Sequence, residues 1–209
     1  MARRDSNTPD FSFELDAQRR GHSVICGIDE AGRGPWAGPV VAAAVVLDPA
    51  CIPKDLNDSK KLNETMREKL FGEIVACAVV SIGIGNEARI DRDNILATTL
   101  WAMAEAVGHL TIMPDLALVD GNRPPKLFCQ VQAIVEGDAK SLSIAAASIV
   151  AKVTRDRLMV DLHSKYPVYG FARHKGYGTA EHHAVLLAHG PCPHHRKSFK
   201  PIPVRPHGQ

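Results

Sequence analysis

The sequence contains no apolar run long enough to cross a membrane, and its first ten residues are polar and charged. A membrane helix needs about 20 consecutive apolar residues, and a secretory signal peptide needs an apolar core close to the N-terminus. Neither feature is found, so we expect a cytoplasmic protein with no membrane partner. Internal repeats, linkers and low-complexity segments are also missing.

Cysteine pairs at metal-binding or redox spacing are missing as well. The five cysteines are odd in number and widely spaced, and no two of them form a C-x-x-C pair. This pattern argues against a disulfide framework and a thiolate zinc site. We expect the cysteines to be reduced and mostly buried. A zinc site built from Cys192 and the histidines of residues 182–195 is a competing interpretation, which their irregular spacing disfavours.

The 209 residues have the composition of an ordinary globular chain, with 45% hydrophobic and 23% charged residues. This length fits one domain. The net charge of +2 hides an asymmetry, because residues 140–200 carry ten Lys or Arg against three acids and the remainder is therefore net negative. Acidic candidate metal ligands in one part and basic candidate phosphate contacts in the other are expected of a nucleic-acid enzyme.

Hydrophobic periodicity predicts an α/β fold in which the first two strands form a hairpin-like pair. The expected strands are 24–29, 40–47, 79–85, 116–119 and 131–135. The expected helices are 62–74, 91–109, 140–163 and a short one from Thr179 to about His189. Asp58 or Ser59 is expected to cap the first helix, and the small residues near the start of the third are expected to pack against the sheet.

The most informative stretch places Asp29 and Glu30 at the end of an apolar run and follows them with Gly32-Arg33-Gly34. Carboxylates bind metal ions, while bare glycine backbone can approach a phosphate or sugar closely. The combination suggests phosphodiester chemistry, and an acidic strand running into a tight turn is the plain alternative. The glycine spacing also fits a dinucleotide fingerprint, but a second strand follows where that motif requires a helix.

Two further carboxylates follow short apolar runs that are typical of buried strands. Asp120 ends one run and Asp138 follows the next, each beside a glycine. Such positions lie where open α/β sheets bind ligands. Asp29, Glu30, Asp120 and Asp138 together have the number and chemistry needed for two Mg²⁺ or Mn²⁺ ions.

These segments resemble the bacterial ribonuclease HII family, in the same order and over most of residues 24–199. The matching segments are GIDEAGRG (27–34), AGPV (37–40), DSKKL (58–62), VDGN (119–122), GDAKS (137–141), AAASIVAKVTRD (145–156), YGF (169–171), HKGYGT (174–179) and HRKSF (195–199). Trp36 stands where leucine is more usual, a change we interpret as packing.

The resemblance implies a ribonuclease H-like fold, with a five-stranded mixed sheet flanked by helices and a short helical or loop segment at the C-terminal end. It implies a single catalytic domain over 21–199, preceded by a loose tail or short helix (1–20) and followed by a tail (200–209). It also implies a metal-dependent endonuclease that hydrolyses the RNA strand of RNA–DNA hybrids. Such an enzyme cuts 5′ of ribonucleotides embedded in duplex DNA, leaving a 3′-OH and a 5′-phosphate.

By the same resemblance, Asp29, Glu30 and Asp120 hold two Mg²⁺ or Mn²⁺ ions and Asp138 completes the catalytic set. The residues expected to bind substrate are Gly32, Arg33, Gly34, Ser59, Lys60, Tyr177 and Arg196. Among them, the glycine-flanked arginine segment and the tyrosine are expected to read the RNA-to-DNA junction.

The basic residues suggest a separate hypothesis about phosphate binding. Several of Lys60, Arg155, Lys175 and Arg196 are expected to contact phosphates. A non-catalytic nucleic-acid binder is the alternative function, but a pure binder has no use for four acids near a polyanion. We expect a monomer without an obligatory protein partner.

Overall fold

The computed structural model describes residues 8–202, and its centre is a mixed sheet in the order β3-β2-β1-β4-β5. The strands are β1 (Ile25–Ala31), β2 (Val40–Leu47), β3 (Ala78–Gly85), β4 (Leu116–Asp120) and β5 (Gln130–Ile134). The β1–β2 and β2–β3 pairs are antiparallel, and the β1–β4 and β4–β5 pairs are parallel. The predicted five-stranded mixed sheet is therefore confirmed, including its opening hairpin.

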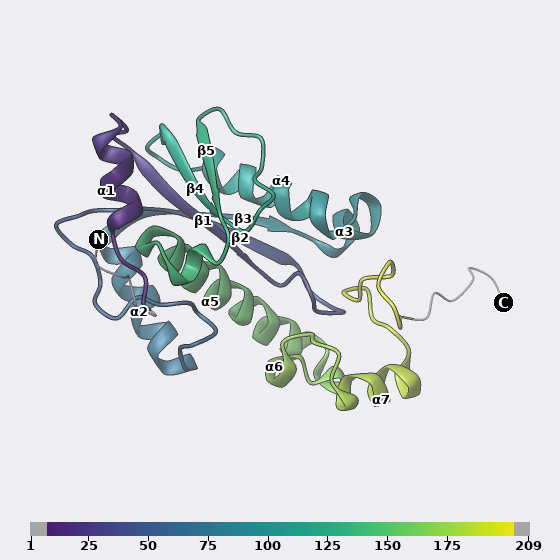
Figure 1. Cartoon of the computed structure of the whole chain (residues 1–209). Helices are drawn as coiled ribbons and strands as arrows, with labels where there is room; N and C mark the ends of the chain where they lie inside the picture. Colours follow the sequence, from purple (N-terminus) through teal and green to yellow (C-terminus); the bar gives the residue numbers. More distant parts are fainter. Residues whose placement is uncertain (1–7, 203–209) are drawn as a thin grey trace.

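Helices cover both faces of this sheet (Figure 1). They are α1 (Ser12–Arg19), α2 (Glu64–Cys77), α3 (Glu87–Asp93), α4 (Ile95–Gly108), α5 (Leu142–Lys165), α6 (Phe171–His174) and α7 (Ala180–His189). Side chains of α2 and α5 form the core on one face, and side chains of α4 form the core on the other. The central strand β1 therefore lies between two apolar layers, which fixes the position of its polar end.

The α5 helix lies unusually close to β1. A Cβ atom on Gly27 would be 2.1 Å from the backbone of Ser143, so only glycine allows this approach. The small residues Ala145, Ala146 and Ala147 are fully buried at the same interface. The packing role expected for these residues is confirmed.

Two local predictions about helices were wrong. The expected helix 91–109 is divided at Asn94, which has a φ of 70° and whose side chain accepts a hydrogen bond from the Ala97 amide. Asparagine tolerates this left-handed conformation and can start a new helix. The cap of α2 is Asn63, whose side chain accepts from Met66, rather than Asp58 or Ser59.

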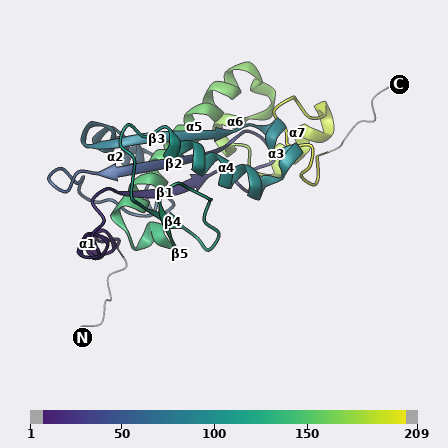
Figure 2. The same ribbon diagram turned by 90° about the horizontal axis from the view of Figure 1, so that it is seen from above.

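The C-terminal segment, residues 190–202, runs from α7 back to α3 (Figure 2). His194 Nδ1 lies 3.1 Å from Glu87 Oε1, and the Ser198 amide donates to Asp91 Oδ1 at 2.9 Å. The predicted cap of α7, Thr179, accepts from His182. This end of the molecule is thus a small helical and loop layer attached to the end of the sheet, as expected.

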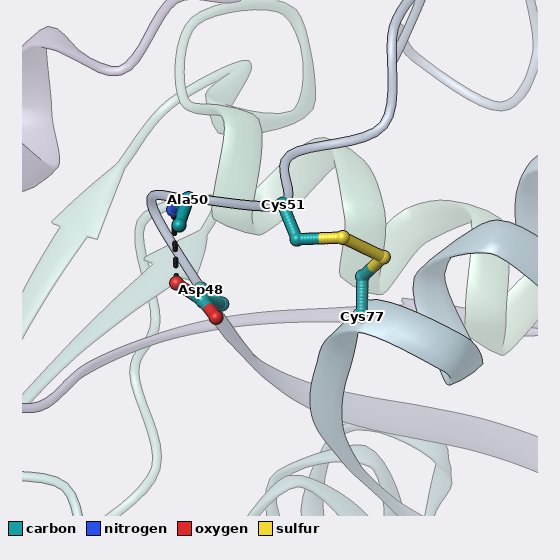
Figure 3. The surroundings of a disulfide bond; sticks show 4 residues. All are labelled: Asp48, Ala50, Cys51 and Cys77. Carbon is teal, nitrogen blue, oxygen red and sulfur yellow. Dashed lines mark hydrogen bonds between the residues drawn. A yellow bond between two sulfur atoms is a disulfide. The ribbon is translucent and has the colours of Figure 1, made fainter.

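A disulfide joins Cys51 and Cys77, contrary to the expectation that all five cysteines are reduced (Figure 3). Cys51 lies in the turn after β2 and Cys77 ends α2, and the fold brings their Cα atoms to 5.6 Å, within the range that a disulfide can bridge. Cysteine spacing alone does not reveal that the end of α2 lies beside the turn after β2. Cys26 and Cys192 are free and buried, as expected.

Within residues 8–202, every helix is too short or too polar to span a bilayer.

Candidate active site

The adjacent carboxylates of β1 are divided between the two faces of the sheet. Asp29 is 5% exposed and borders a cavity with α5, whereas Glu30 also borders a second cavity formed by α4. This is the alternation expected for consecutive residues of a strand. Glu30 Oε1 accepts a hydrogen bond from Arg33 at 3.2 Å.

Asp120 lies beside them because β4 runs parallel to β1, with Val119 paired to Ile28. Asp120 Oδ1 accepts a hydrogen bond of 2.7 Å from the Gly137 amide. A Cβ on Gly137 would be 2.6 Å from Ile144 and 3.3 Å from that same carboxylate oxygen. Glycine therefore lets the turn approach Asp120 without displacing the Ile144 side chain.

Asp138 follows in the same turn, in the short 3-10 helix η1 (Gly137–Ala139). It is 4% exposed, and its Oδ2 atom accepts from Lys60 Nζ at 3.2 Å. Lys60 thus links the loop before α2 to the turn after β5, and two of the predicted site segments meet at this ion pair.

Helix α1 supports this turn from behind. Glu14 is 1% exposed, and its Oε1 atom accepts from Ser141 Oγ at 2.6 Å and from the Ser143 amide at 2.9 Å. The Asp10 amide also donates to the Lys140 carbonyl at 3.1 Å. Of the two options for the N-terminal part, the short helix is correct for residues 12–19, whereas residues 1–7 lie outside the described part of the chain.

The segment Gly32-Arg33-Gly34 is held by two buried arginines. Arg196 is 0% exposed and donates to the carbonyls of Gly32, Arg33, Gly38 and Pro39. Gly32 has a φ of +96°. Its conformation therefore depends on glycine, and its carbonyl is turned toward the guanidinium.

Arg155 is the second buried arginine, 1% exposed, and it donates to the carbonyls of Ala37, Pro39 and Lys175. The expectation that Arg155 and Arg196 contact phosphates is therefore corrected. Their guanidinium groups are turned inward and pair with backbone oxygens, so they shape the loop rather than bind substrate directly.

A cavity of about 260 Å³ gathers most of the residues predicted from the sequence. The predicted residues that line it are Asp29, Glu30, Asp120, Gly32, Arg33, Gly34, Ser59, Lys60 and Tyr177. Asp138 adjoins it through Lys60, and Arg196 lies behind the loop. Candidate metal ligands and candidate substrate contacts therefore share one hollow.

Ser148 and Lys152 also line this cavity and were missed. They are four residues apart on α5, one turn of the same helix face. Ser148 was grouped with the small packing residues, although its Oγ donates to Ser59 Oγ at 2.7 Å. Burial lowers the pKa of Lys152, which donates to Asp156 at 2.7 Å. The signal in the sequence that could have identified them is the four-residue spacing of Ser148 and Lys152, which places two polar side chains on one face of the helix.

Tyr177 lies beside the glycine-flanked arginine. A Cβ on Gly34 would be 3.7 Å from its ring, and the side chain is 47% exposed. Trp36 packs over Gly178, where a Cβ would be 2.2 Å from the indole, so its predicted packing role is confirmed. The ring of Tyr177 is thus held at the mouth of the cavity with one side open to solvent.

The electrostatics of the site favour a bound cation. Burial raises the pKa of Asp29 well above its ordinary range, and the charges of Glu30 and Asp120 raise it further. Burial also raises the pKa of Glu30 and of Asp138, against the opposing effects of Arg33 and Lys60. Four acids that repel one another in a half-buried cavity can be balanced by divalent cations.

The donor set fits hard cations, because it consists of carboxylate oxygens. As the side chains stand, no three His, Cys, Asp or Glu residues within 8–202 are grouped closely enough to hold a metal ion. Glu30 and Asp138 instead pair with Arg33 and Lys60. Binding a cation would therefore exchange these two ion pairs for metal contacts.

Two of the C-terminal histidines, His182 and His195, are joined by hydrogen bonds to each other and to the backbone. His195 Nδ1 accepts from the Cys192 amide at 3.0 Å, so its proton is on Nε2, 2.9 Å from His182 Nε2. His182 then donates from Nδ1 to the Tyr177 carbonyl at 2.9 Å. Two neutral rings thus connect the C-terminal segment to the tyrosine loop.

This histidine pair predicts a loss of stability in acid. Burial, with help from the neighbouring His182, lowers the pKa of His195 to about 4 from 6.5. Between those pH values the unfolded chain binds a proton that the folded chain does not. The free energy of unfolding should therefore fall as the pH drops, by at most about 3 kcal/mol from this residue.

Urea unfolding of the parent and of His195→Asn at pH 7 and pH 4.5 would measure this effect. Asparagine keeps a hydrogen-bond acceptor but does not titrate, so its stability should fall less over the same interval. Equal losses in both proteins would contradict the assignment.

A mixed sheet in the order β3-β2-β1-β4-β5, with carboxylates at the ends of β1 and β4 and a further acid after β5, is the arrangement of a ribonuclease H-like fold. The sequence model of the ribonuclease HII family matches residues 26–202. The ribonuclease HII of Xanthobacter autotrophicus is 58% identical over 193 residues, which cover 92% of this chain and 78% of the relative. The chain belongs to the ribonuclease HII family.

Solved structures agree with this assignment. Ribonuclease H2 from Pyrococcus horikoshii superimposes with a TM-score of 0.72 at 28% identity, covering 85% of this chain and 94% of that one. RNase HII from Archaeoglobus fulgidus, solved in a complex with PCNA, gives the same TM-score and identity over 89% and 98% of the two chains. The chain is therefore a hydrolase, an endonuclease with ribonuclease H activity on RNA–DNA hybrids, from a family that depends on divalent metal ions.

Proposed function

We propose that this endonuclease cuts both the RNA strand of hybrids and duplex DNA that holds a single ribonucleotide, on the 5′ side of that ribonucleotide. Water adds to the phosphorus, the bond from phosphorus to the 3′ oxygen breaks, and that oxygen takes a proton. The products carry a 3′-OH and a 5′-phosphate. The observation that carries the proposal is the shared cavity of Asp29, Glu30 and Asp120 with the Gly32–Gly34 segment and Tyr177.

Asp29, Glu30 and Asp120 would hold two divalent ions, Mg²⁺ or Mn²⁺, with Asp138 completing the set. Two such ions, when bound, activate the attacking water and stabilise the leaving oxygen. The protein's own contribution is to keep Asp29 and Asp138 buried and to hold Asp120 with the Gly137 amide. The pure-binder alternative has no role for this arrangement, and the family is one of hydrolases.

Substrate recognition follows from the exposed part of the loop. Arg155 and Arg196 donate hydrogen bonds to the backbone carbonyls of residues 32, 33 and 37–39. These hydrogen bonds hold the loop in place before substrate binds. Gly34 and the Arg33 side chain remain exposed beside Tyr177. We assign the 2′-OH of the ribonucleotide to this backbone and the adjacent sugar to the tyrosine ring, since only the 2′-OH distinguishes the two sugars.

The proposal is tested by incubating the protein with Mg²⁺ or Mn²⁺ and duplex DNA that contains one ribonucleotide, and mapping the cut. Cleavage at the 5′ side, leaving a 5′-phosphate on the ribonucleotide, supports the proposal. Cleavage only within longer RNA segments, or on the 3′ side, contradicts it. The monomeric state remains a prediction.

Tyr177→Ala should lower cleavage at a single embedded ribonucleotide by about 10²-fold or more, because the junction then lacks its stacking surface. Cleavage of an all-RNA hybrid should fall less, since many positions along it can be cut. Tyr177→Phe separates the ring from the hydroxyl. Rates on both substrates, measured beside melting temperatures, check the prediction.

The tyrosine is half-exposed, so its removal should change the melting temperature little. Parental cleavage of the single-ribonucleotide duplex by Tyr177→Ala would show that the ring does not read the junction. An equal loss of cleavage on both substrates would also contradict the junction-reading role.

A further inference from the structure

A second cavity, of about 150 Å³, lies on the other side of the carboxylates. Its apolar wall comes from α4, with Leu96, Leu100 and Met103. Asn122 and Arg123, from the loop between β4 and β5, supply its polar wall. None of these residues took part in the site described above.

The two cavities share Glu30, Arg33 and Asp120. The first is bordered by Ser148 and Lys152 of α5 and the second by α4, and these helices cover opposite faces of the sheet (Figure 1). The cavities are therefore two halves of one groove that passes over the end of the sheet. A nucleic-acid strand with a phosphate at the carboxylates must extend into both halves.

Arg123 has the properties of a phosphate contact. Its side chain is exposed and makes no hydrogen bond or ion pair with any residue in the described range 8–202, unlike the buried Arg155 and Arg196. Pro124 and Pro125 follow it, and a residue before proline is confined to extended conformations. The guanidinium is thus carried on a restricted backbone at the border of the groove, where it can bind phosphate.

The balance of charge in this half also favours a nucleotide. Glu30 and Asp120 would repel a phosphate, but Arg33 pairs with Glu30, and Arg123 adds a positive charge at the outer end. The leucines and the methionine offer an apolar surface for a sugar or base. The cavity therefore suits a nucleotide.

We propose that this second cavity binds the nucleotide immediately 5′ of the scissile phosphate, and that Arg123 contacts the phosphate on the 5′ side of that nucleotide. The inference rests on the proposed function, because the first cavity is assigned to the ribonucleotide on the 3′ side. The upstream nucleotide, which leaves with the new 3′-OH, then lies next to the second cavity, which shares Glu30, Arg33 and Asp120 with the first.

The test pairs Arg123→Ala with a substrate change, a neutral methylphosphonate at the phosphate next upstream of the scissile one. Binding of duplex DNA with one ribonucleotide is measured by fluorescence anisotropy in EDTA, where no cleavage occurs, at several salt concentrations. Arg123→Ala should weaken binding of the normal duplex about tenfold and lower the salt slope by about one. The methylphosphonate should weaken binding by the parent similarly, and the variant should lose nothing more.

Lys126→Ala is the matched control, since Lys126 is an exposed cation of the same loop that does not line the cavity. It should show no coupling to the methylphosphonate. The inference is overturned if Arg123→Ala behaves like Lys126→Ala, or if its effect couples to a methylphosphonate downstream of the cut. Mapping the cut made by the parent tests the proposed function separately, so the two failures are distinguishable.

Discussion

Replacing Asp120 by asparagine should reduce cleavage of an RNA–DNA hybrid by at least about 10²-fold, because the amide removes a negative charge and a proposed metal ligand from the centre of the site. The fold should survive. The amide oxygen can still accept the 2.7 Å hydrogen bond from Gly137. Substrate binding should be unchanged or slightly tighter, since one charge that repels phosphate is gone.

The same result is expected for Asp29→Asn, Glu30→Gln and Asp138→Asn. Turnover at saturating Mg²⁺, substrate affinity in EDTA and melting temperature should be measured for each variant. Glu136→Gln is the control, because Glu136 is an exposed acid two residues before Asp138. Near-normal turnover in Asp120→Asn would contradict the two-metal assignment.

The sequence was sufficient for the topology because its strongest signals are local. The apolar runs 40–47 and 116–119 coincide with β2 and with most of β4, and β5 differs from its prediction by one residue at each end. The strand boundaries that were predicted wrongly depend on contacts between strands. Strand β1 continues through Asp29 and Glu30 to Ala31, because β2 pairs with it over that length.

The candidate site was also predictable, but only as a set of residue types. Acids after apolar strands and glycines around an arginine point to the cavity that contains them. The roles of Arg155 and Arg196 were not predictable, because a charged residue in a basic segment is normally exposed. Apart from the Lys175 carbonyl, the acceptors of their guanidinium groups are backbone carbonyls more than a hundred residues away in the sequence.

The disulfide was missed for a related reason. Cys51 and Cys77 are separated by 26 residues, and nothing in that spacing shows that α2 returns to the turn after β2 (Figure 3). Cysteine counting detects frameworks with many bridges. Cysteine counting cannot detect a single disulfide in a chain that also has three free cysteines.

Arg196→Ala should destabilise the protein strongly. The side chain is 0% exposed, and its guanidinium donates to four carbonyls of residues 32–39. The Pro39 carbonyl keeps Arg155 as a donor, so three carbonyls lose their donor at about 1–3 kcal/mol each, roughly 3–9 kcal/mol in total. For a domain of this size, that loss lowers the melting temperature by about 10 °C or more.

Comparing Arg196→Lys with Arg196→Ala separates the effect of the charge from the effect of the guanidinium geometry. Burial, with the nearby charge of Arg155, lowers the pKa of Arg196 to about 9, so the group is still charged at pH 7. Lysine keeps that charge but is a point charge with three donors, and it cannot reach the four carbonyls that the planar guanidinium spans. The lysine variant should fold with reduced stability and a less rigid Gly32–Gly34 segment.

Two measurements separate this scaffold role from a phosphate contact. Arg196→Lys should lower kcat/KM for a single embedded ribonucleotide about tenfold or more, because a loosened loop no longer holds the sugar. The salt slope of binding by Arg196→Ala, measured well below its melting temperature, should match the parent, since no phosphate contact is lost. Arg33→Ala removes the exposed cation of the same loop and is the control that should lower the slope. A slope reduced by about one in Arg196→Ala, with stability unchanged, would restore the phosphate-contact hypothesis and contradict the scaffold role.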